Sequence, residues 1–576
     1  MMPVHETYDV IVIGAGAGGM TAAAVAAAEG LRVLVIEKTA FVGGTTAWSD
    51  GMVWIPANAK MKETGLADSI ADAVQYLSST VPEPANAGLR AAFLARGPEA
   101  IAYLEARTEV QLRPVKACPD HYPERLGATY GGRVLQPVTF DGTWLGEAFA
   151  RLRPPLPEFM LFGGMMVDCL DIPHLCRVGK SLRSTLRVAR LVSQYALQRL
   201  RWSRGTTLHL GNALAARLYA SLLARRVEIL FSADVEDLSM QGDRVSGVVI
   251  RHGARDRLIT ARRGVVLATG GFSHDAILRK RFFPAAAGLV SATDTSTTGD
   301  GIRLATTAGA ALNREATSPA YWVPASLFRR ADGRNGVFPH MVTDRAKPGV
   351  IAVNAAGRRF VNEALPYHEF ALAMLRDANG ERDRPFYLVC DRPFLWSYGL
   401  GRIRPFTRNV RRYVAGGELI EAPDIAELAA KIGIKPAVLT ATIASYNADA
   451  KEGRDPEFGR GSTIYQRHHG DAAHKPNPCV APIVGAPFFA MRIYPADLGT
   501  AIGMKVDAQA RVLREDGTPI AGLYACGNDM GSITNGNCPA PGIMLGPALT
   551  FGYIAGRHLA EGAAMAIGTA AASASV

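Results

Sequence analysis

The chain has 576 residues, enough for two or three domains, and its 48% hydrophobic and 20% charged residues are typical of a globular protein. No run of about 18 uncharged apolar residues occurs, so the sequence predicts no transmembrane helix. The formal net charge is +11, but the basic residues do not cluster with aromatic ones in a known module, and we expect no nucleic acid partner.

A glycine-rich turn lies between two predicted strands near the start of the chain. The apolar strand at 8–13 runs into the glycine-rich stretch 14–19, an alanine-rich helical stretch follows, and a second strand at 32–36 ends on Glu37. Spaced glycines allow a tight turn, close approach of the backbone to a pyrophosphate, and close packing of helix on strand. The helix N-terminus then faces the phosphates and the acid accepts from a ribose hydroxyl. Because every context element of the motif is present, the segment predicts a dinucleotide site.

Later segments return to the same fold. Residues 43–46 form a predicted loop on the pyrophosphate side, one apolar strand ends at Gly270, and another ends at Gly527, before Gly542 and a helical pattern. A nicotinamide enzyme can complete its site within one local unit, whereas this chain comes back to the site near its far end. The pattern therefore favours FAD over NAD, and because no histidine lies near 43–46 we expect the FAD to be held non-covalently.

The residues expected to bind FAD come from all of these segments. In chain order they are Gly14, Gly16, Ala17, Gly18, Gly19, Glu37, Lys38, Gly44, Thr45, Thr46, Ser49, Asp50, Gly51, Ala268, Thr269, Gly270, Asp300, Gly527, Asn528, Gly542, Met544 and Leu545.

The middle of the chain differs from both ends. Residues 1–284 alternate strand and helix patterns, 285–484 change character and end in a proline-rich stretch, and the flavin pattern resumes at 485. We therefore predict an α/β fold with a Rossmann-like FAD-binding domain (1–284 and 485–576), interrupted by an inserted α+β cap or substrate domain (285–484). The active site is expected between the two domains. A stretch at about 155–205 has no clear role.

Residues 180–204 alternate leucines with arginines at helical spacing. One interpretation is the solvated face of a packed helix. The other is a basic amphipathic surface that contacts an anionic membrane, where apolar substrates partition. Little precedes the first strand, which leaves no room for a signal peptide, so we expect a cytoplasmic protein, peripheral at the inner face of the membrane in the second interpretation.

Cysteine and histidine usage predicts neither disulfides nor metal. Seven cysteines are scattered along the chain without a C-x-x-C motif, and the twelve histidines show no spacing such as H-E-x-x-H. This pattern fits a reducing compartment and argues against a disulfide framework and a zinc site.

Several longer segments resemble the 3-ketosteroid Δ1-dehydrogenase group of the fumarate reductase flavoprotein superfamily, over most of the chain. They are 43–56, 357–363 with Tyr367-His368, 455–461, 497–500, and 541–542 followed by 546–553. The resemblance implies FAD-dependent α,β-dehydrogenation of a cyclic ketone. In that chemistry a base takes the α proton, the β hydrogen leaves as hydride to flavin N5, and donors to the carbonyl oxygen stabilise the enolate.

Carried over position by position, the resemblance implies a changed active site. Tyr321 matches the base tyrosine, although its position also suits an aromatic buried in the core of the cap. His121 stands where the family has a supporting tyrosine. Cys538 replaces the tyrosine that binds the carbonyl, while Gly542 keeps the backbone N–H beside it.

The missing phenol leaves the substrate open. A cysteine thiol is a weak donor, so either another donor has moved in or the ketone sits differently. Tyr195, in the amphipathic stretch, is a candidate for that donor or for the base, and smaller ring ketones of the cyclohexanone dehydrogenase type are an alternative to steroids. A tyrosine base has an ordinary pKa of about 10, so a cation such as protonated His121 would help it.

Two other functions compete with ketone desaturation. An ene-reductase of the fumarate reductase type needs cationic residues, which Arg402, Arg404, Arg408, Arg411 and Arg412 could supply, but 498–500 lacks the His-Thr pair of that branch. The third is a non-catalytic flavin-binding protein. The expected partners are a small apolar ketone and an electron acceptor that the sequence does not identify.

Overall fold

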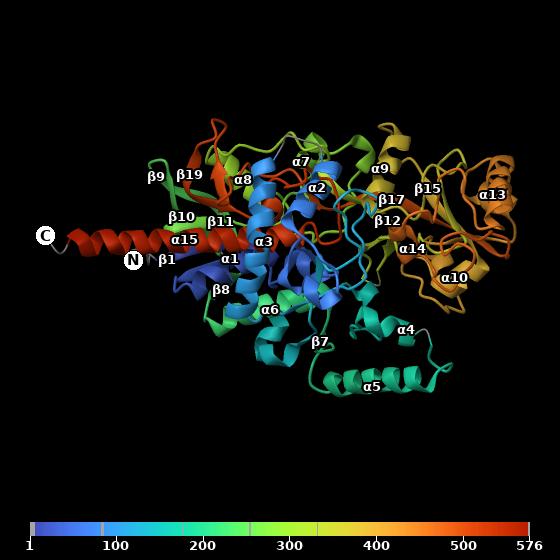
Figure 1. The fold of residues 1–576 in the computed structure, drawn as a ribbon, viewed down its shortest axis with the longest axis horizontal. Coiled ribbons are helices and arrows are strands. Elements are labelled where there is room, and N and C mark those ends of the chain that lie inside the picture. Colours follow the sequence, from blue (N-terminus) through green and yellow to red (C-terminus); the bar gives the residue numbers. More distant parts are fainter. Residues whose placement is uncertain (1–5, 82–85, 176, 253–254, 331, 574–576) are drawn as a thin grey trace.

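The computed structural model describes residues 6–81, 86–175, 177–252, 255–330 and 332–573. One part of the fold is an eight-stranded, mainly parallel sheet in the order β18-β19-β10-β11-β1-β2-β8, with β9 paired to β10 (Figure 1). β1 pairs in parallel with both β2 and β11, and β11 pairs in parallel with β19. The strands are β1 (Glu6–Ile13), β2 (Val33–Glu37), β8 (Glu228–Phe231), β9 (Asp234–Gln241), β10 (Arg244–His252), β11 (Arg255–Leu267), β18 (Arg511–Leu513) and β19 (Pro519–Ala525).

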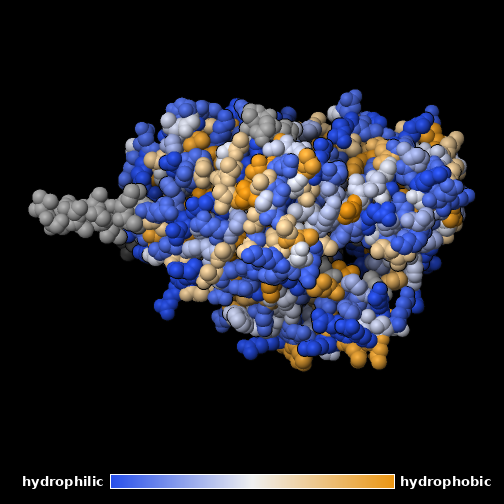
Figure 2. All heavy atoms as spheres, in the orientation of Figure 1, coloured by the Kyte–Doolittle hydropathy of each residue, from blue (hydrophilic) through white to orange (hydrophobic). Residues whose placement is uncertain are grey.

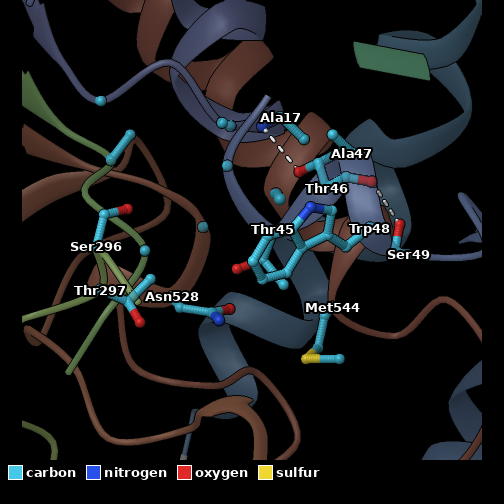
Figure 3. A pocket seen from close by; sticks show the side chains of 18 of the residues that line it. Ala17, Thr45, Thr46, Ala47, Trp48, Ser49, Ser296, Thr297, Asn528 and Met544 are labelled. Carbon is cyan, nitrogen blue, oxygen red and sulfur yellow. Dashed lines mark hydrogen bonds between the residues drawn. The ribbon is translucent and has the colours of Figure 1, made fainter. Parts of the chain in front are cut away.

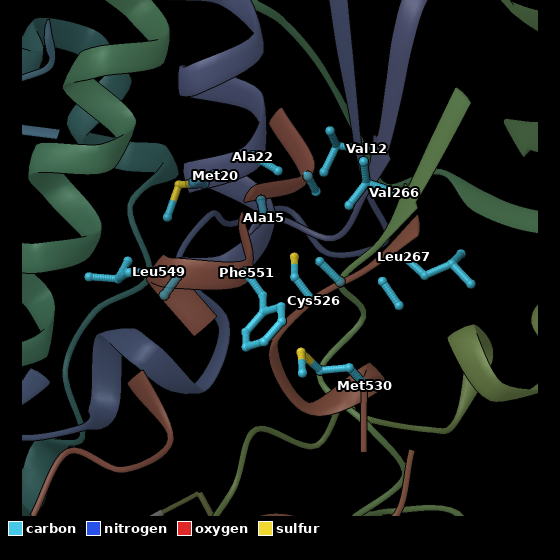
Figure 4. Close-up of a cluster of buried hydrophobic side chains, with 14 of the residues drawn as sticks. Val12, Ala15, Met20, Ala22, Val266, Leu267, Cys526, Met530, Leu549 and Phe551 are labelled. Carbon is cyan, nitrogen blue, oxygen red and sulfur yellow. The ribbon is translucent and has the colours of Figure 1, made fainter. Parts of the chain in front are cut away.

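Helix α1 (Ala17–Ala28) lies between this sheet and the long helix α15 (Leu545–Ser573). The first ten residues of α1 are buried, and their small side chains allow this close approach. Figure 4 shows the result, a core in which Met20 and Phe551 from the two helices meet Val12 and Val266 from the strands. The other helices of this part are α2 (Ile70–Thr80), α3 (Ala87–Arg107), α6 (Leu210–Ala224), α7 (Ala276–Phe282) and α8 (Asp300–Thr307).

A second sheet has six strands and only antiparallel pairs, in the order β13-β12-β17-β15-β14, with β16 paired to β17. Its strands are β12 (Ala320–Arg329), β13 (Asn335–Pro339), β14 (Val350–Val353), β15 (Phe386–Asp391), β16 (Ile420–Ala422) and β17 (Phe488–Thr500). The central strand β17 lies beyond residue 484, the end that the sequence predicts for the cap. The predicted mixed α/β class is confirmed as a parallel-dominated sheet with a separate antiparallel sheet.

Helices surround the second sheet and occupy the other end of the molecule (Figure 1). They are α9 (Tyr367–Ala378), α10 (Arg392–Tyr398), α11 (Arg411–Ala415), α12 (Ile425–Lys431), α13 (Pro436–Ala450) and α14 (Ile464–His469). Short strands complete the fold, namely β3 (Val53–Trp54), β4 (Leu112–Pro114) and β5 (Val134–Pro137) in one sheet, and β6 (Phe140–Asp141) with β7 (Thr207–Leu208) in another.

Two of the family-like segments, 357–363 and 455–461, meet in a buried ionic network. The Arg359 guanidinium donates to Asp455 over 2.7 Å and to Glu363 over 2.8 Å, and Arg460 donates to Glu363 over 3.1 Å. Buried charges persist when they are paired and hydrogen-bonded in this way. These segments therefore stabilise the part of the molecule that surrounds the second sheet.

The stretch at about 155–205 leaves the main body. It contains α4 (Ile172–Leu175) and α5 (Leu182–Arg199), which pack on each other at the lower edge of Figure 1. Ser184 is the buried residue of α5, whereas Leu182 and Leu186 expose 77% and 62% of their surface. These two leucines are therefore exposed, whereas Leu191 and Tyr195 of the same helix are half-buried.

Candidate functional site

A cavity of about 560 Å³ receives residues from both sheets. It lies at the carboxyl ends of β1, β2 and β11, where Ile13, Ile36 and Ala268 form part of its wall. Ligands of open parallel sheets bind at this edge. All of the residues expected to bind FAD line the cavity except Gly19 and Gly51.

The three glycines of the first turn have different roles, which follow from their positions. A Cβ on Gly16 would meet no atom within 4 Å, so this glycine leaves open space on the cavity wall. Gly14 has φ +103°, and a Cβ there would lie 2.2 Å from the Ala268 carbonyl oxygen. A Cβ on Gly19 would lie 2.0 Å from the Gly14 carbonyl oxygen, so Gly19 allows helix and strand to pack rather than touching the cavity.

Loop residues fold over this turn. The 3₁₀ helix η1 (Gly44–Trp48) places Thr46 against the start of α1, where its Oγ1 accepts from the Ala17 N–H over 3.2 Å (Figure 3). Figure 3 also shows that Thr45, Trp48, Thr297 and Asn528, which come from distant segments, surround one space.

Three charged residues of the cavity wall, Glu37, Lys38 and Asp300, bind other groups of the protein. Glu37 is buried at the end of β2, and its carboxylate accepts from the Ala15 N–H over 3.0 Å and the Thr39 N–H over 2.8 Å. Lys38 and Asp300, predicted from separate segments, form an ion pair of 2.6 Å on the cavity wall. An open glycine, a helix N-terminus and an acid at the end of the next strand fit a dinucleotide.

Asp529, which sequence reasoning missed, is not on the cavity wall but binds Thr269, which is. Its carboxylate accepts from the Thr269 N–H over 2.5 Å and from the Gly271 N–H over 3.0 Å, and so joins the segments that follow β11 and β19. Burial raises its pKa to about 6. The signal was an acid directly after Gly527-Asn528.

The other end of the cavity is apolar. Its walls come partly from the stretch at about 155–205, whose role the sequence left open, and partly from the second sheet and its neighbours. The apolar residues there are Pro155, Leu156, Phe159, Met166, Pro339, Met341, Leu498 and Met544.

Tyr321 lies in β12 next to this region but is not part of the cavity wall. Its side chain is 4% exposed, and its hydroxyl shares hydrogen bonds with Ser532 (2.7 Å) and Thr534 (3.4 Å). Burial raises the pKa of Tyr321 to about 12, although these two hydrogen bonds act in the opposite direction.

Tyr367, which the sequence analysis quoted only as part of a resemblance, does line the cavity. It begins α9, and its hydroxyl oxygen accepts from the buried Cys538 thiol over 3.4 Å. Burial, followed by the influence of Cys538, raises the pKa of Tyr367 well above its ordinary value. The signal was available, since Tyr367 belongs to one of the family-like segments.

His121 is buried behind Tyr367, with the two rings edge to face and their centroids 5.4 Å apart. Its Nδ1–H donates to the Cys538 carbonyl over 2.7 Å, yet burial lowers the pKa of His121 to about 4. The expectation of a protonated His121 is therefore wrong, because the buried imidazole is neutral at neutral pH.

Other candidates lie elsewhere. The Tyr195 hydroxyl donates to the Phe162 carbonyl over 3.0 Å within the excursion around α5, and the cavity wall does not include it. The arginines from Arg402 to Arg412 also lie outside the wall, where Arg402 pairs with Glu418. These arginines therefore do not supply the cationic substrate site that the fumarate reductase alternative requires.

The described part of the chain has no group of three or more His, Cys, Asp or Glu residues arranged to hold a metal ion. Within the same residues, no helix is long and apolar enough to cross a membrane.

Comparison with known proteins agrees with this site. Residues 9–545 match the FAD binding domain family. The chain is 37% identical to 4-oxocyclohex-2-ene-1-carboxylate 5-dehydrogenase of Sinomonas cyclohexanicum, over 96% of this chain and 94% of the relative. It is 35% identical to 3-oxosteroid 1-dehydrogenase of Mycobacterium tuberculosis, over 97% of this chain and 99% of the relative.

A solved structure shows the same relation in three dimensions. The crystal structure of 3-ketosteroid Δ1-dehydrogenase from Sterolibacterium denitrificans, in complex with 1,4-androstadiene-3,17-dione, superposes with a TM-score of 0.89 at 36% identity. The alignment covers 97% of this chain and 100% of that one. The chain therefore belongs to the FAD-binding flavoproteins of the ketone dehydrogenase type, oxidoreductases that act on CH–CH bonds and include the 3-oxosteroid 1-dehydrogenases.

Proposed function

We propose that this enzyme dehydrogenates an apolar cyclic ketone between its α and β carbons, with FAD held non-covalently. The observation that carries the proposal is that one cavity combines the wall expected for a dinucleotide with an apolar end. The relatives support this reading, since their names describe action on rings of both sizes, oxocyclohexene carboxylates and oxosteroids.

FAD would be held by the glycine-rich turn, η1 and the segments after β11 and β19, which line the cavity together. When bound, FAD supplies the two-electron oxidant that the reaction requires. This assignment completes the finer fold, a Rossmann-like domain interrupted by a cap. We place the end of the cap near residue 500 rather than 484, because β17 is the central strand of the cap sheet.

The proton acceptor is one of two buried tyrosines, Tyr321 or Tyr367. We favour Tyr367, since a base must reach the proton that it removes and Tyr367 is the one on the cavity wall. The Gly542 backbone lies on the same wall, and its N–H is proposed to donate to the ketone oxygen. Oxygen-binding donors of this kind stabilise the enolate as it forms.

We also propose that the excursion around α5 contacts an anionic membrane. Its exposed leucines alternate with exposed arginines, and Figure 2 shows apolar side chains at the lower edge where α5 lies. Phe159 is 44% exposed and also lines the apolar end of the cavity. An apolar ketone dissolved in lipid would thereby reach the cavity without crossing water.

One assay separates the candidate functions. Purified enzyme is incubated with cyclohexanone, androstenedione or fumarate and an artificial electron acceptor or donor. Turnover of either ketone supports the proposal. The ratio of kcat/KM for cyclohexanone to that for androstenedione shows which ring size the enzyme prefers. Reduction of fumarate without oxidation of a ketone would contradict it.

A further inference from the structure

Asp50 is an acidic side chain on the cavity wall, and it forms no ion pair with any residue that the structure describes. It follows η1, between Ser49 and Gly51, and its Oδ1 accepts from the Met52 N–H over 3.2 Å. More than a third of its surface is accessible, and the residue lines the cavity. The pKa of the Asp50 carboxyl is raised because the surrounding cavity walls desolvate it, and two backbone N–H groups oppose the rise.

Asp50 lies beside the groups proposed to handle the ketone. Met52 connects it to Gly542, because the Met52 carbonyl oxygen lies 2.7 Å from where a Cβ on Gly542 would stand. Asp50, Gly542 and Tyr367 all line the cavity.

Cys538 cannot donate a hydrogen bond to the ketone oxygen as the family tyrosine in its position does. It is 1% exposed, it is not part of the cavity wall, and its thiol is directed to the Tyr367 hydroxyl. The carbonyl oxygen of a substrate therefore lacks one donor at this position, and a donor from another segment has to take its place.

We propose that Asp50, carrying its proton, donates a hydrogen bond to the ketone oxygen together with the Gly542 N–H. This inference rests on the proposed function. As the α proton leaves for the base, negative charge grows on the oxygen and the Asp50 O–H bond to it strengthens, while the proton stays on Asp50. A carboxylic acid kept neutral by its apolar surroundings can serve as such a donor at neutral pH.

The titratable groups that share an interaction with Asp50 do not obscure its titration. They are Tyr367 on α9 and Cys118 in the loop after β4. Burial raises the pKa of Cys118 to about 12, and that of Tyr367 is also raised, so both stay neutral where a carboxylic acid titrates. The donor form is the protonated one, so the proposal predicts that kcat/KM falls as pH rises through the Asp50 pKa.

Two nearly isosteric variants test this role. Asp50→Asn keeps a donor but cannot ionise, whereas Asp50→Leu keeps the size and loses the donor. We expect Asp50→Asn to stay within about tenfold of wild-type turnover and to lose the fall at high pH. Asp50→Leu should lose about 10²–10³-fold in kcat, the usual effect of removing one oxyanion donor. Its flavin content and Tm should match those of Asp50→Asn.

Binding gives a second readout that is independent of turnover. An unreactive enone product is titrated into each variant and followed by the flavin absorbance, and Asp50→Leu should raise its Kd about tenfold relative to Asp50→Asn. Equal loss of kcat in both variants, with a profile that falls at low pH, would make Asp50 a base and overturn the proposal. Wild-type behaviour of Asp50→Leu would also overturn it. If the wild-type enzyme oxidises no ketone, the proposed function fails instead.

Discussion

At Gly16 the important property is empty space. Nothing stands within 4 Å of the position of a Cβ, so Gly16→Val can fold, but its side chain occupies the wall that a pyrophosphate must approach. We expect purified Gly16→Val to be colourless, whereas wild type is yellow and releases intact FAD on heating or acid treatment. Flavin absorbance and Tm are measured together, with Gly88→Val as a control at an exposed glycine of α3 that also has open space and no positive φ. A yellow Gly16→Val protein would contradict the cofactor assignment.

The two tyrosines differ in what they touch. Tyr367 lines the cavity, while Tyr321 is held by Ser532 and Thr534. Because general base catalysis contributes about 10²–10⁴-fold, Tyr367→Phe should lower kcat by at least about a hundredfold with flavin retained. Tyr321→Phe should cause the smaller loss. Steady-state kinetics of both variants decide the matter, and a larger loss in Tyr321→Phe would return the base to the residue predicted from sequence.

His121 links stability to pH. Its folded pKa is about 4 and its ordinary value is 6.5, so between these values the unfolded chain binds the extra proton. The contribution to stability is complete above pH 6.5 and is lost as pH falls toward 4, amounting to at most about 3 kcal/mol.

His121→Asn keeps a donor near the Nδ1 position but does not titrate in this range. Its unfolding free energy should therefore fall less steeply than that of wild type as the pH is lowered between these limits. Denaturant unfolding at several pH values gives the comparison, and identical slopes would show that His121 is not buried in its neutral form.

At the scale of elements, α5 tests the membrane proposal. Leu186 and Leu197 expose 62% and 69% of their surface on this helix. Replacing both by glutamate removes apolar area and adds repulsion from anionic lipid. Co-sedimentation with phosphatidylglycerol vesicles should fall at least about tenfold, and turnover of water-soluble cyclohexanone should not change. Leu289→Glu, at a leucine 70% exposed outside this stretch, is the control. Equal sedimentation of all three proteins would reject the contact.

Local sequence patterns predicted individual helices and strands better than they predicted which distant segments contact each other. The β1–α1–β2 unit and the later strands β11 and β19 could be read from the sequence, because apolar strands that end in glycine are local signals. The contact of Phe159 and Met166 with the cavity could not be predicted. No hydrophobic periodicity indicates which distant segment of the chain lines a cavity. The extent of β17 was missed for a related reason, because pairing with β12 and β15 depends on distant residues.

The candidate site divides in the same way. Backbone-defined positions such as Gly14, Gly16 and Gly542 were predictable, because the geometry of a turn restricts the residue type. The protonation state of His121 was not, since it depends on burial by segments far away in sequence. Tyr367 also escaped assignment, because only the folded structure distinguishes a tyrosine on the cavity wall from one behind it.

For the whole molecule, two sheets of different type bring a nucleotide site and an apolar pocket into one cavity. The parallel sheet presents its carboxyl edge, and the antiparallel sheet with the excursion around α5 closes the apolar side. We propose that a ketone placed in this pocket would give its β hydrogen to the bound flavin as hydride while its α proton goes to a base.

Anaerobic titration of the yellow enzyme with cyclic ketones tests that claim most directly. Without an electron acceptor, cyclohexanone or androstenedione should bleach the flavin absorbance and yield the matching enone, one equivalent for each flavin reduced. Flavin that stays oxidised with every cyclic ketone, but is reoxidised by fumarate after chemical reduction, would contradict the account.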